Sequence, residues 1–324
     1  MIDHKGTAVN ARPNIGLHRL AILLWCMTIV LLGAGALVTS NEAGDSVPDW
    51  PVSFGRWLIS SNNFVANVRF EYSHRVIAEI VGLTTLLLAL WAQFSERRSW
   101  MRKLGWVAFV GVVAQAGIGG VRVLLPEYKA LIAVPHALIA QSFFAVVVAI
   151  AVFTSRSWSE AHAVKPDGSG VSLRKLVAAT VVAVLIQLVL GAGFRHQAFG
   201  IIPHIVGAVV VSTLIVSSLV ALMRRHGDDA YLARPGKGAL ALLLIQVCLG
   251  VAAYFARLAS ASNPQPLEPM ISLTVAHLVV GGLTLATIVV LALRCFQVLA
   301  PRREQATGSV SARGLRSSAR GAAV

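Results

Sequence analysis

Four histidines, His74, His136, His204 and His277, each lie near the beginning of a long apolar stretch. Ionisable side chains are costly inside apolar membrane segments and usually serve a function there. Imidazole is a ligand for zinc, copper and iron. We therefore interpret these four residues as metal ligands, against the alternative that each is a hydrogen-bonded packing residue.

The further ligands that a zinc site needs do not accompany these histidines. No third or fourth Cys, Asp or Glu occurs at zinc-like spacing near either pair. Two histidines that project from facing helices of a four-helix bundle leave a slot in which a flat macrocycle is held at both axial positions. The sequence thus favours two haem groups, one bound by His74 and His136 and the other by His204 and His277.

Three arginines, Arg75, Arg195 and Arg257, lie at or near the same ends of these stretches. A guanidinium group stays charged and binds carboxylates in bidentate fashion. We expect these arginines to bind haem propionates, with Arg75 and Arg195 as the main candidates. The alternative is that they extend to lipid headgroups.

Glu71 precedes His74 by three residues in the segment EYSHRVIAEIVG, so that both share one face of a helix. The matching position in the second half is Ile201, and its surroundings, FRHQAFGIIPHIVG, contain no acidic residue. This asymmetry predicts chemistry at the first site, with Glu71 as the catalytic carboxylate, and electron transfer at the second. The alternative is that Glu71 pairs with Arg75 or caps the helix. Glu79, deeper in the same span, is expected to face the bundle interior.

The elements that must position these residues are membrane-spanning helices. Hydrophobic residues make up 56% of the 324 residues and charged residues 13%, which is not the balance of a soluble domain. Apolar windows of about 20 residues, the length that crosses a bilayer, lie at 17–38, 73–93, 103–123, 131–153, 173–193, 201–223, 238–257 and 271–296. The predicted fold is an all-α integral membrane protein with eight transmembrane helices.

The positive charges predict the orientation in the membrane. A net charge of +14 suits a nucleic-acid partner only where the charges cluster, and here they lie between the apolar runs. With the N-terminus in the cytoplasm, the inner segments carry 21 of the 28 Lys and Arg residues. This bias predicts a multi-pass protein of the cell inner membrane with both termini in the cytoplasm and the four histidines near the outer face. Lipid is an expected partner, and nucleic acid is not.

An internal repeat divides the chain. Corresponding residues offset by 130 to 141 positions are His74 and His204, His136 and His277, Gln115 and Gln246, and Gly119 and Gly250. The sequence GAG at 33–35 also resembles GAG at 191–193. A duplicated four-helix unit predicts two bundles related by a pseudo-twofold axis along the membrane normal. The glycines of GVVAQAGIGG are attributed to close helix packing.

The predicted organisation follows from this repeat. It comprises a cytoplasmic N-terminus (1–16), a first bundle (17–155), a cytoplasmic linker (156–172), a second bundle (173–299) and a disordered basic tail (300–324). The outer loop TSNEAGDSVPDWPVSFGRW connects the first two spans, and we expect its aromatic residues either at the membrane interface or over the first site. All three cysteines fall within predicted spans, so the outer loops have none to pair.

The chain resembles the haem A synthases from about residue 17 to 296. The most specific matching segments are GALVTS, VPDWPVSFG, EYSHR, PHALIAQ, GAGFRH and AHLVVGG, in this order. The resemblance implies that the protein oxidises a methyl group of haem O to the formyl group of haem A for terminal oxidases. It also implies that His74 and His136 bind the substrate haem, that Glu71 assists catalysis, and that His204 and His277 ligate a permanent haem b.

The resemblance has one departure and leaves alternatives open. Some members of the family have a cysteine pair in the first outer loop, which here contains none. A non-catalytic dihaem electron carrier of the cytochrome b kind would use the same four histidines, and a transporter or haem-free assembly factor would leave them without a purpose. A haem O synthase, an electron-transfer protein and a second copy of the chain are candidate partners.

Overall fold

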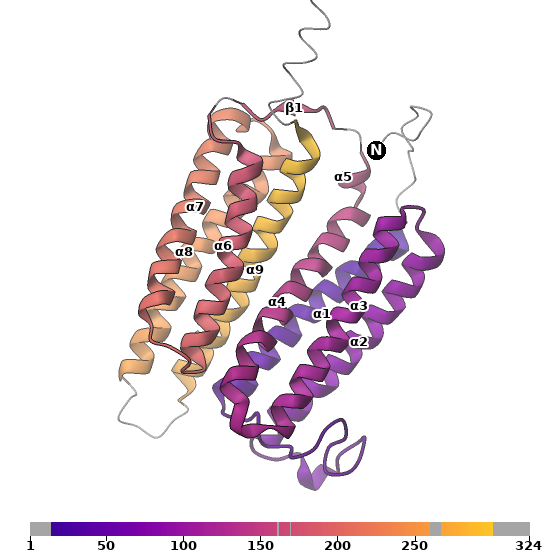
Figure 1. Cartoon of the computed structure of the whole chain (residues 1–324), viewed down its shortest axis with the longest axis vertical. Coiled ribbons are helices and arrows are strands. Elements are labelled where there is room, and N and C mark those ends of the chain that lie inside the picture. Colours follow the sequence, from indigo (N-terminus) through magenta and orange to yellow (C-terminus); the bar gives the residue numbers. More distant parts are fainter. Residues whose placement is uncertain (1–13, 161, 169, 260–266, 301–324) are drawn as a thin grey trace, which may run out of the picture.

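The computed structural model describes residues 14–160, 162–168, 170–259 and 267–300 and consists almost entirely of helices (Figure 1). Eight of them are long and apolar enough to cross a membrane. These are α1 (Ile15–Ser40), α2 (Val68–Ser95), α3 (Ser99–Leu124), α4 (Lys129–Thr154), α6 (Leu173–Arg195), α7 (Ile202–His226), α8 (Ala230–Ala259) and α9 (Glu268–Val298). The chain is therefore an all-α, multi-pass membrane protein, as its composition predicted.

The short elements lie in the connections. They are two 3-10 turns, η1 (Ser61–Asn63) and η2 (Pro126–Tyr128), the short helix α5 (Arg156–Ser159), and two strands, β1 (Lys165–Pro166) and β2 (Leu299–Ala300). The strands pair in parallel at the end of the molecule that lies opposite the long loop 41–67 (Figure 1).

Every long helix ends beyond the apolar window that predicted it, and all but α6 and α7 also begin before that window. The largest difference is at α8, which begins at Ala230 rather than at 238. The Asp229 side chain accepts a hydrogen bond from the Tyr231 backbone N–H at 3.0 Å and so caps the first turn. The charged residues Arg234 and Lys237 follow within this early part of the helix, so it lacks the apolar composition of a membrane span.

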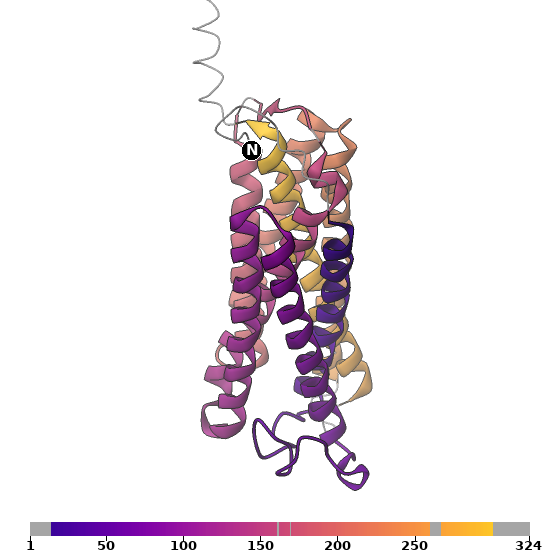
Figure 2. The ribbon, with the colours of Figure 1, turned by 90° about the vertical axis from the view of Figure 1, so that its right-hand side faces the viewer.

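The long helices form two groups of four. Helices α1 to α4 pack in a closed ring in which each helix contacts its two neighbours, and α6 to α9 form a ring of the same kind. The two groups meet through α1 and α4 on one side and α6 and α9 on the other. Figure 1 shows them standing side by side, and Figure 2 shows the first group in front of the second. The twofold relation between the groups and their division into domains remain predictions.

Helix α4 belongs to the cores of both groups. Phe143 and Val147 pack in the core of the first group, while the neighbouring Phe144 and Val148 pack with α7, α8 and α9. Large apolar side chains on the outside, such as Leu83 and Phe94, remain exposed at 69% and 86%. In a membrane protein these are the side chains that lipid covers. The predicted basic tail (300–324), apart from Ala300 in β2, and residues 1–13 of the predicted N-terminus (1–16) lie outside the described residues.

Candidate functional site

The four histidines lie on the four helices that begin at the same end of the molecule (Figure 1). His204 is the third residue of α7, His74 the seventh of α2, His136 the eighth of α4 and His277 the tenth of α9. At a rise of about 1.5 Å per residue, all four lie within about 14 Å of the beginning of their helices. His277 lies in the third turn, deeper than predicted, because α9 begins three residues before its apolar window.

His204 and His277 face each other within the second group of helices. Their ring centroids are 6.3 Å apart and their planes are nearly perpendicular, at 77°. Two imidazoles that share one metal ion, each at a metal–nitrogen distance of about 2 Å, place their centroids about 6 Å apart. The observed separation therefore fits one iron between the two rings.

Two glutamines contact this second pair. Gln187 donates to the His204 backbone oxygen at 2.9 Å, and its amide nitrogen lies 3.0 Å from His204 Nδ1. The Gln246 backbone oxygen lies 3.1 Å from His277 Nδ1, and the Gln246 amide nitrogen lies 3.3 Å from His277 Nε2. Neither glutamine was among the predicted site residues, although the repeat analysis had matched Gln246 with Gln115.

His74 and His136 belong to the first group, and they are close enough to interact electrostatically. Nδ1 of each ring is buried and makes no hydrogen bond of normal geometry, although the Leu31 backbone lies close to the His74 ring. Buried polar atoms are normally paired, and the described residues leave these two ring atoms without full partners. Two imidazoles that interact across the first group fit a pair of ligands for one bound group.

The Glu71 carboxylate is buried and anchors the outer loop. Oε2 accepts backbone N–H groups from Ser46 at 2.8 Å and Val47 at 2.9 Å. Oε1 accepts the Arg75 guanidinium at 2.7 Å. Glu71 thus forms the ion pair with Arg75 that the sequence offered as the alternative to a catalytic role. It also accepts two backbone N–H groups of the loop. A carboxylate offers about four acceptor positions, so three partners leave it one free lone pair.

Arg75 completes this anchor. Besides Glu71, its guanidinium donates to the backbone oxygens of Asp49 at 2.7 Å, Val52 at 3.1 Å and Val47 at 3.2 Å. Most of its donors are therefore used by the loop. Propionate binding by Arg75 remains a prediction, and it would require a share of these donors.

Two further contacts fix the same loop over the end of the first group. Arg122 of α3 donates to the Gly44 backbone oxygen at 2.6 Å. The Trp50 indole lies on Gly120 so closely that a Cβ placed there would be 2.4 Å from Trp50 Cδ2. Of the two locations expected for the loop aromatics, Trp50 thus takes the one beside the first site, whereas Trp57 remains 71% exposed.

Basic residues gather where the two groups meet at this end. Arg195 donates to Ser40 Oγ at 2.9 Å and so joins α6 to α1. Burial, and then the nearby charges of Arg195 and Arg122, lower the pKa of His196 to about 4. His196 is therefore neutral at physiological pH and does not add to the positive charge of the cluster. Arg257 lies over the Phe194 ring at 5.0 Å.

Two predictions about individual residues need correction. Glu79 is exposed and does not face the bundle interior, because it lies on α2 away from the stripe that includes the buried Val81 and Thr85. The glycines of GVVAQAGIGG were attributed to close helix packing, and Gly119 does lie against His136 of α4, but Gly120 lies against Trp50 of the loop and a Cβ at Gly117 would meet nothing within 4 Å.

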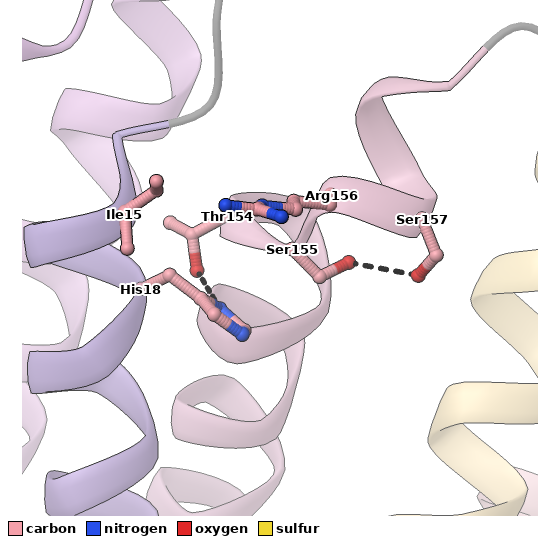
Figure 3. A pocket seen from close by; sticks show the side chains of 6 residues that line it. All are labelled: Ile15, His18, Thr154, Ser155, Arg156 and Ser157. Atoms are coloured by element: carbon pink, nitrogen blue, oxygen red, sulfur yellow. Dashed lines mark hydrogen bonds between the residues drawn. The ribbon is translucent and has the colours of Figure 1, made fainter.

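A cavity of about 300 Å³ lies at the opposite end of the molecule. His18 Nδ1 and Thr154 Oγ1 are 3.1 Å apart in its wall, and Arg156 lies beside them (Figure 3). The cavity contains none of the four histidines, so it is separate from the candidate site.

The chain is similar to known proteins of one family. A family model described as "Cytochrome oxidase assembly protein" matches residues 18–203, which include Glu71, His74 and His136 and end one residue before His204. A protein named heme A synthase from Exiguobacterium sibiricum is 28% identical over 178 residues, which cover 54% of this chain and 58% of that protein.

Two other similar proteins bear the same name. The one from Alkalihalophilus pseudofirmus is 32% identical over 37% of this chain and 40% of its own length. The one from Symbiobacterium thermophilum is 27% identical over 71% of this chain and 83% of its own length. The chain thus spans only about half the length of the first two relatives, but most of the third.

Proposed function

Because the chain belongs to the cytochrome oxidase assembly protein family, we propose that it is a haem A synthase. In this proposal it oxidises a methyl group of haem O, through the alcohol level, to the formyl group of haem A, which terminal oxidases use. The name shared by its relatives supports this activity. Support from the chain itself comes from two histidine pairs, one in each helix group, and from Glu71, which precedes His74 by three residues and has no acidic counterpart before His204.

The observation that carries the proposal is the geometry of the second pair. His204 and His277, with ring centroids 6.3 Å apart, would hold a haem b at both axial positions. Bound there, haem b would supply one-electron transfer. The chain contributes the two imidazoles and the glutamine contacts that fix their orientation, and it places no acidic residue in the segment around His204.

The substrate would bind in the first group, between His74 and His136. Helices α2 and α4 supply these residues, and the outer loop with Trp50 closes the end of the group above them. The apolar farnesyl tail of haem O would enter from the bilayer, along the lipid-facing surface of the helices. The loop would keep bulk water from the reacting methyl group.

Glu71 has two roles in this proposal. It holds the loop in place through Ser46 and Val47, and its free lone pair accepts a proton or orients water during the oxidation. The second role requires the reacting group to come within hydrogen-bond distance of this carboxylate. The Arg75 guanidinium, 2.7 Å away, offsets part of the cost of burying this carboxylate.

The basic cluster at the junction would bind the propionates of the two haem groups. Arg195 lies between α6 and α1, and Arg257 lies close by over Phe194. The proposed membrane orientation places this cluster and the four histidines near the outer face of the cell inner membrane, with both termini in the cytoplasm. A haem O synthase and an electron-transfer protein remain the proposed partners.

Haem extraction followed by chromatography tests the activity. Cells that make haem O but no haem A are analysed with and without the protein, and with Glu71→Ala and Glu127→Ala variants. Haem A should appear with the wild type and with Glu127→Ala, an exposed glutamate at the same end, but not with Glu71→Ala. Bound haem b in the wild-type protein without any haem A, in the presence of a working electron-transfer partner, would instead establish a dihaem electron carrier.

A further inference from the structure

Each of the four histidines lies against a glycine of the preceding long helix. A Cβ placed on the glycine would come within 2.8 to 3.2 Å of the histidine Cε1, closer than the 3.5–4.0 Å or so at which carbon atoms pack. The pairs and their distances are Gly35 and His74 at 3.1 Å, Gly119 and His136 at 3.2 Å, Gly191 and His204 at 3.0 Å, and Gly250 and His277 at 2.8 Å.

The rings are turned in the same way at all four positions. Cε1 is the ring atom nearest to the glycine and Nδ1 is the next, while Nε2 lies farther away or beyond 4 Å. The edge that carries Nδ1 therefore faces the neighbouring helix at all four positions, and Nε2 is directed away from it. At His277 the Gln246 amide nitrogen lies 3.3 Å from Nε2, and a ligand at this nitrogen would take the place of that amide. Four repetitions of one orientation, on four different helix pairs, are not explained by general helix packing.

Because glycine has no side chain, it also leaves a backbone carbonyl of its own helix accessible to the histidine. In an α-helix the carbonyl of residue i−4 lies one turn below residue i, where a side chain at residue i would partly cover it. Gln246 is four residues before Gly250, and its backbone oxygen lies 3.1 Å from His277 Nδ1. Metal-binding histidines usually donate the second ring N–H to such an acceptor, which fixes the tautomer and the ring orientation.

We propose that Gly35, Gly119, Gly191 and Gly250 are positioning residues that set the rotation of the four imidazoles. The inference rests on the proposed ligation of haem by these histidines. A methyl group at Gly250 would force the His277 ring to move by several tenths of an ångström and would strain its contact with Gln246 O. Because the ring rotation changes the ligand field at the iron, the effect should be visible in the spectrum of the bound haem as well as in activity.

The alignment of the two GAG segments in the sequence differs from the pairing of glycines and histidines in the structure. The two GAG segments align Gly33 with Gly191 and Gly35 with Gly193, but it is Gly35 and Gly191 that lie on histidines. Gly193 lies on Phe199 instead, and a Cβ at Gly33 would meet only Val279 at 3.7 Å. The sequence match is therefore two residues out of register with the contacts.

The experiment uses the full-length protein purified with its bound haem. Gly250→Ala is compared with Gly238→Ala in the same helix, where a Cβ would meet only Thr287 Cγ2 at 3.6 Å. The readouts are the low-spin ferric electron paramagnetic resonance spectrum, the midpoint potential of haem b and the thermal unfolding temperature. We expect the spectrum and the potential to shift in Gly250→Ala and to stay at wild-type values in Gly238→Ala, with similar unfolding temperatures.

An unchanged spectrum and potential in folded, haem-loaded Gly250→Ala would overturn the positioning role. If Gly250→Ala does not fold, Gly191→Ala carries the same test, since its Cβ would lie slightly farther from His204. His277→Ala is measured in parallel. A low-spin haem b signal that survives in His277→Ala would refute the proposed ligands themselves, whereas its loss beside an unaffected Gly250→Ala would refute the positioning role alone.

The first group offers an independent comparison. Gly119→Ala places a methyl group against His136, while Gly117→Ala, two residues away, places one in open space. Gly119→Ala should change the spectrum of the substrate haem and leave that of haem b unchanged, and Gly117→Ala should change neither. Equal effects from Gly117→Ala and Gly119→Ala would contradict a specific role for the contact with His136.

Discussion

Replacing Glu71 with alanine should loosen the outer loop. The substitution removes the acceptor of the Ser46 and Val47 backbone N–H groups and one partner of Arg75. Each buried donor left without a partner costs about 1–3 kcal/mol. Arg75 keeps its contacts with loop backbone oxygens, so we expect the loss to be about 3 kcal/mol in total.

Hydrogen exchange measures this directly. An opening free energy lower by about 3 kcal/mol speeds exchange of the Ser46 and Val47 amides by about 100-fold. Glu127→Ala, which changes an exposed glutamate at the same end, should leave these rates at the wild-type value. Exchange rates at Ser46 and Val47 that are the same in Glu71→Ala and wild type would refute the anchoring role.

Glu71→Gln separates the two proposed roles of this residue. The amide oxygen still accepts the Ser46 and Val47 N–H groups, but the amide is not a base and its NH2 group cannot accept from Arg75. The loop amides should therefore exchange more slowly than in Glu71→Ala, while haem A formation falls as far as in Glu71→Ala. A fully active Glu71→Gln enzyme would show that the carboxylate serves only to hold the loop.

Two other contacts give predictions of their own. Gly120→Ala should displace the Trp50 indole and shift its fluorescence, whereas Gly117→Ala should not. At the opposite end, burial raises the pKa of Asp229, but its hydrogen bonds to Lys165 and to a backbone N–H outweigh burial and hold the pKa below its ordinary value. This contribution to stability is present above about pH 4 and is lost as the pH falls through the folded-state pKa. Thermal unfolding of Asp229→Asn should therefore depend less on pH below about pH 4 than that of the wild type.

The eight helices could be predicted from the sequence because a bilayer imposes a length and an apolar composition on every span. The beginning of α8 could not, since Asp229 and the charged residues after it start the helix outside its apolar part. The four histidines were found for a related reason. An ionisable residue is conspicuous in an apolar stretch, and all four lie near the beginning of an even-numbered span.

The contacts within the site could not be predicted in this way. They involve the outer loop, and no regular sequence pattern specifies the conformation of a loop. Glu71 was identified from its spacing to His74, but its two backbone partners lie 24 and 25 residues away in the outer loop. The glycines beside the histidines were visible in the sequence, but Gly119 was attributed to helix packing, and Gly35, Gly191 and Gly250 served only to match the two repeats. Their contacts with the imidazole rings depend on the pairing of helices in space, which spacing along the chain does not give.

The most direct test of the account is the haem content of two purified variants, His74→Ala and His277→Ala, together with haem A formation in the same cells. The account predicts that His74→Ala keeps haem b but forms no haem A, and that His277→Ala loses haem b. Normal haem A formation by His74→Ala, or a full complement of low-spin haem b in His277→Ala, would contradict the assignment of a substrate site to the first helix group and an electron-transfer site to the second.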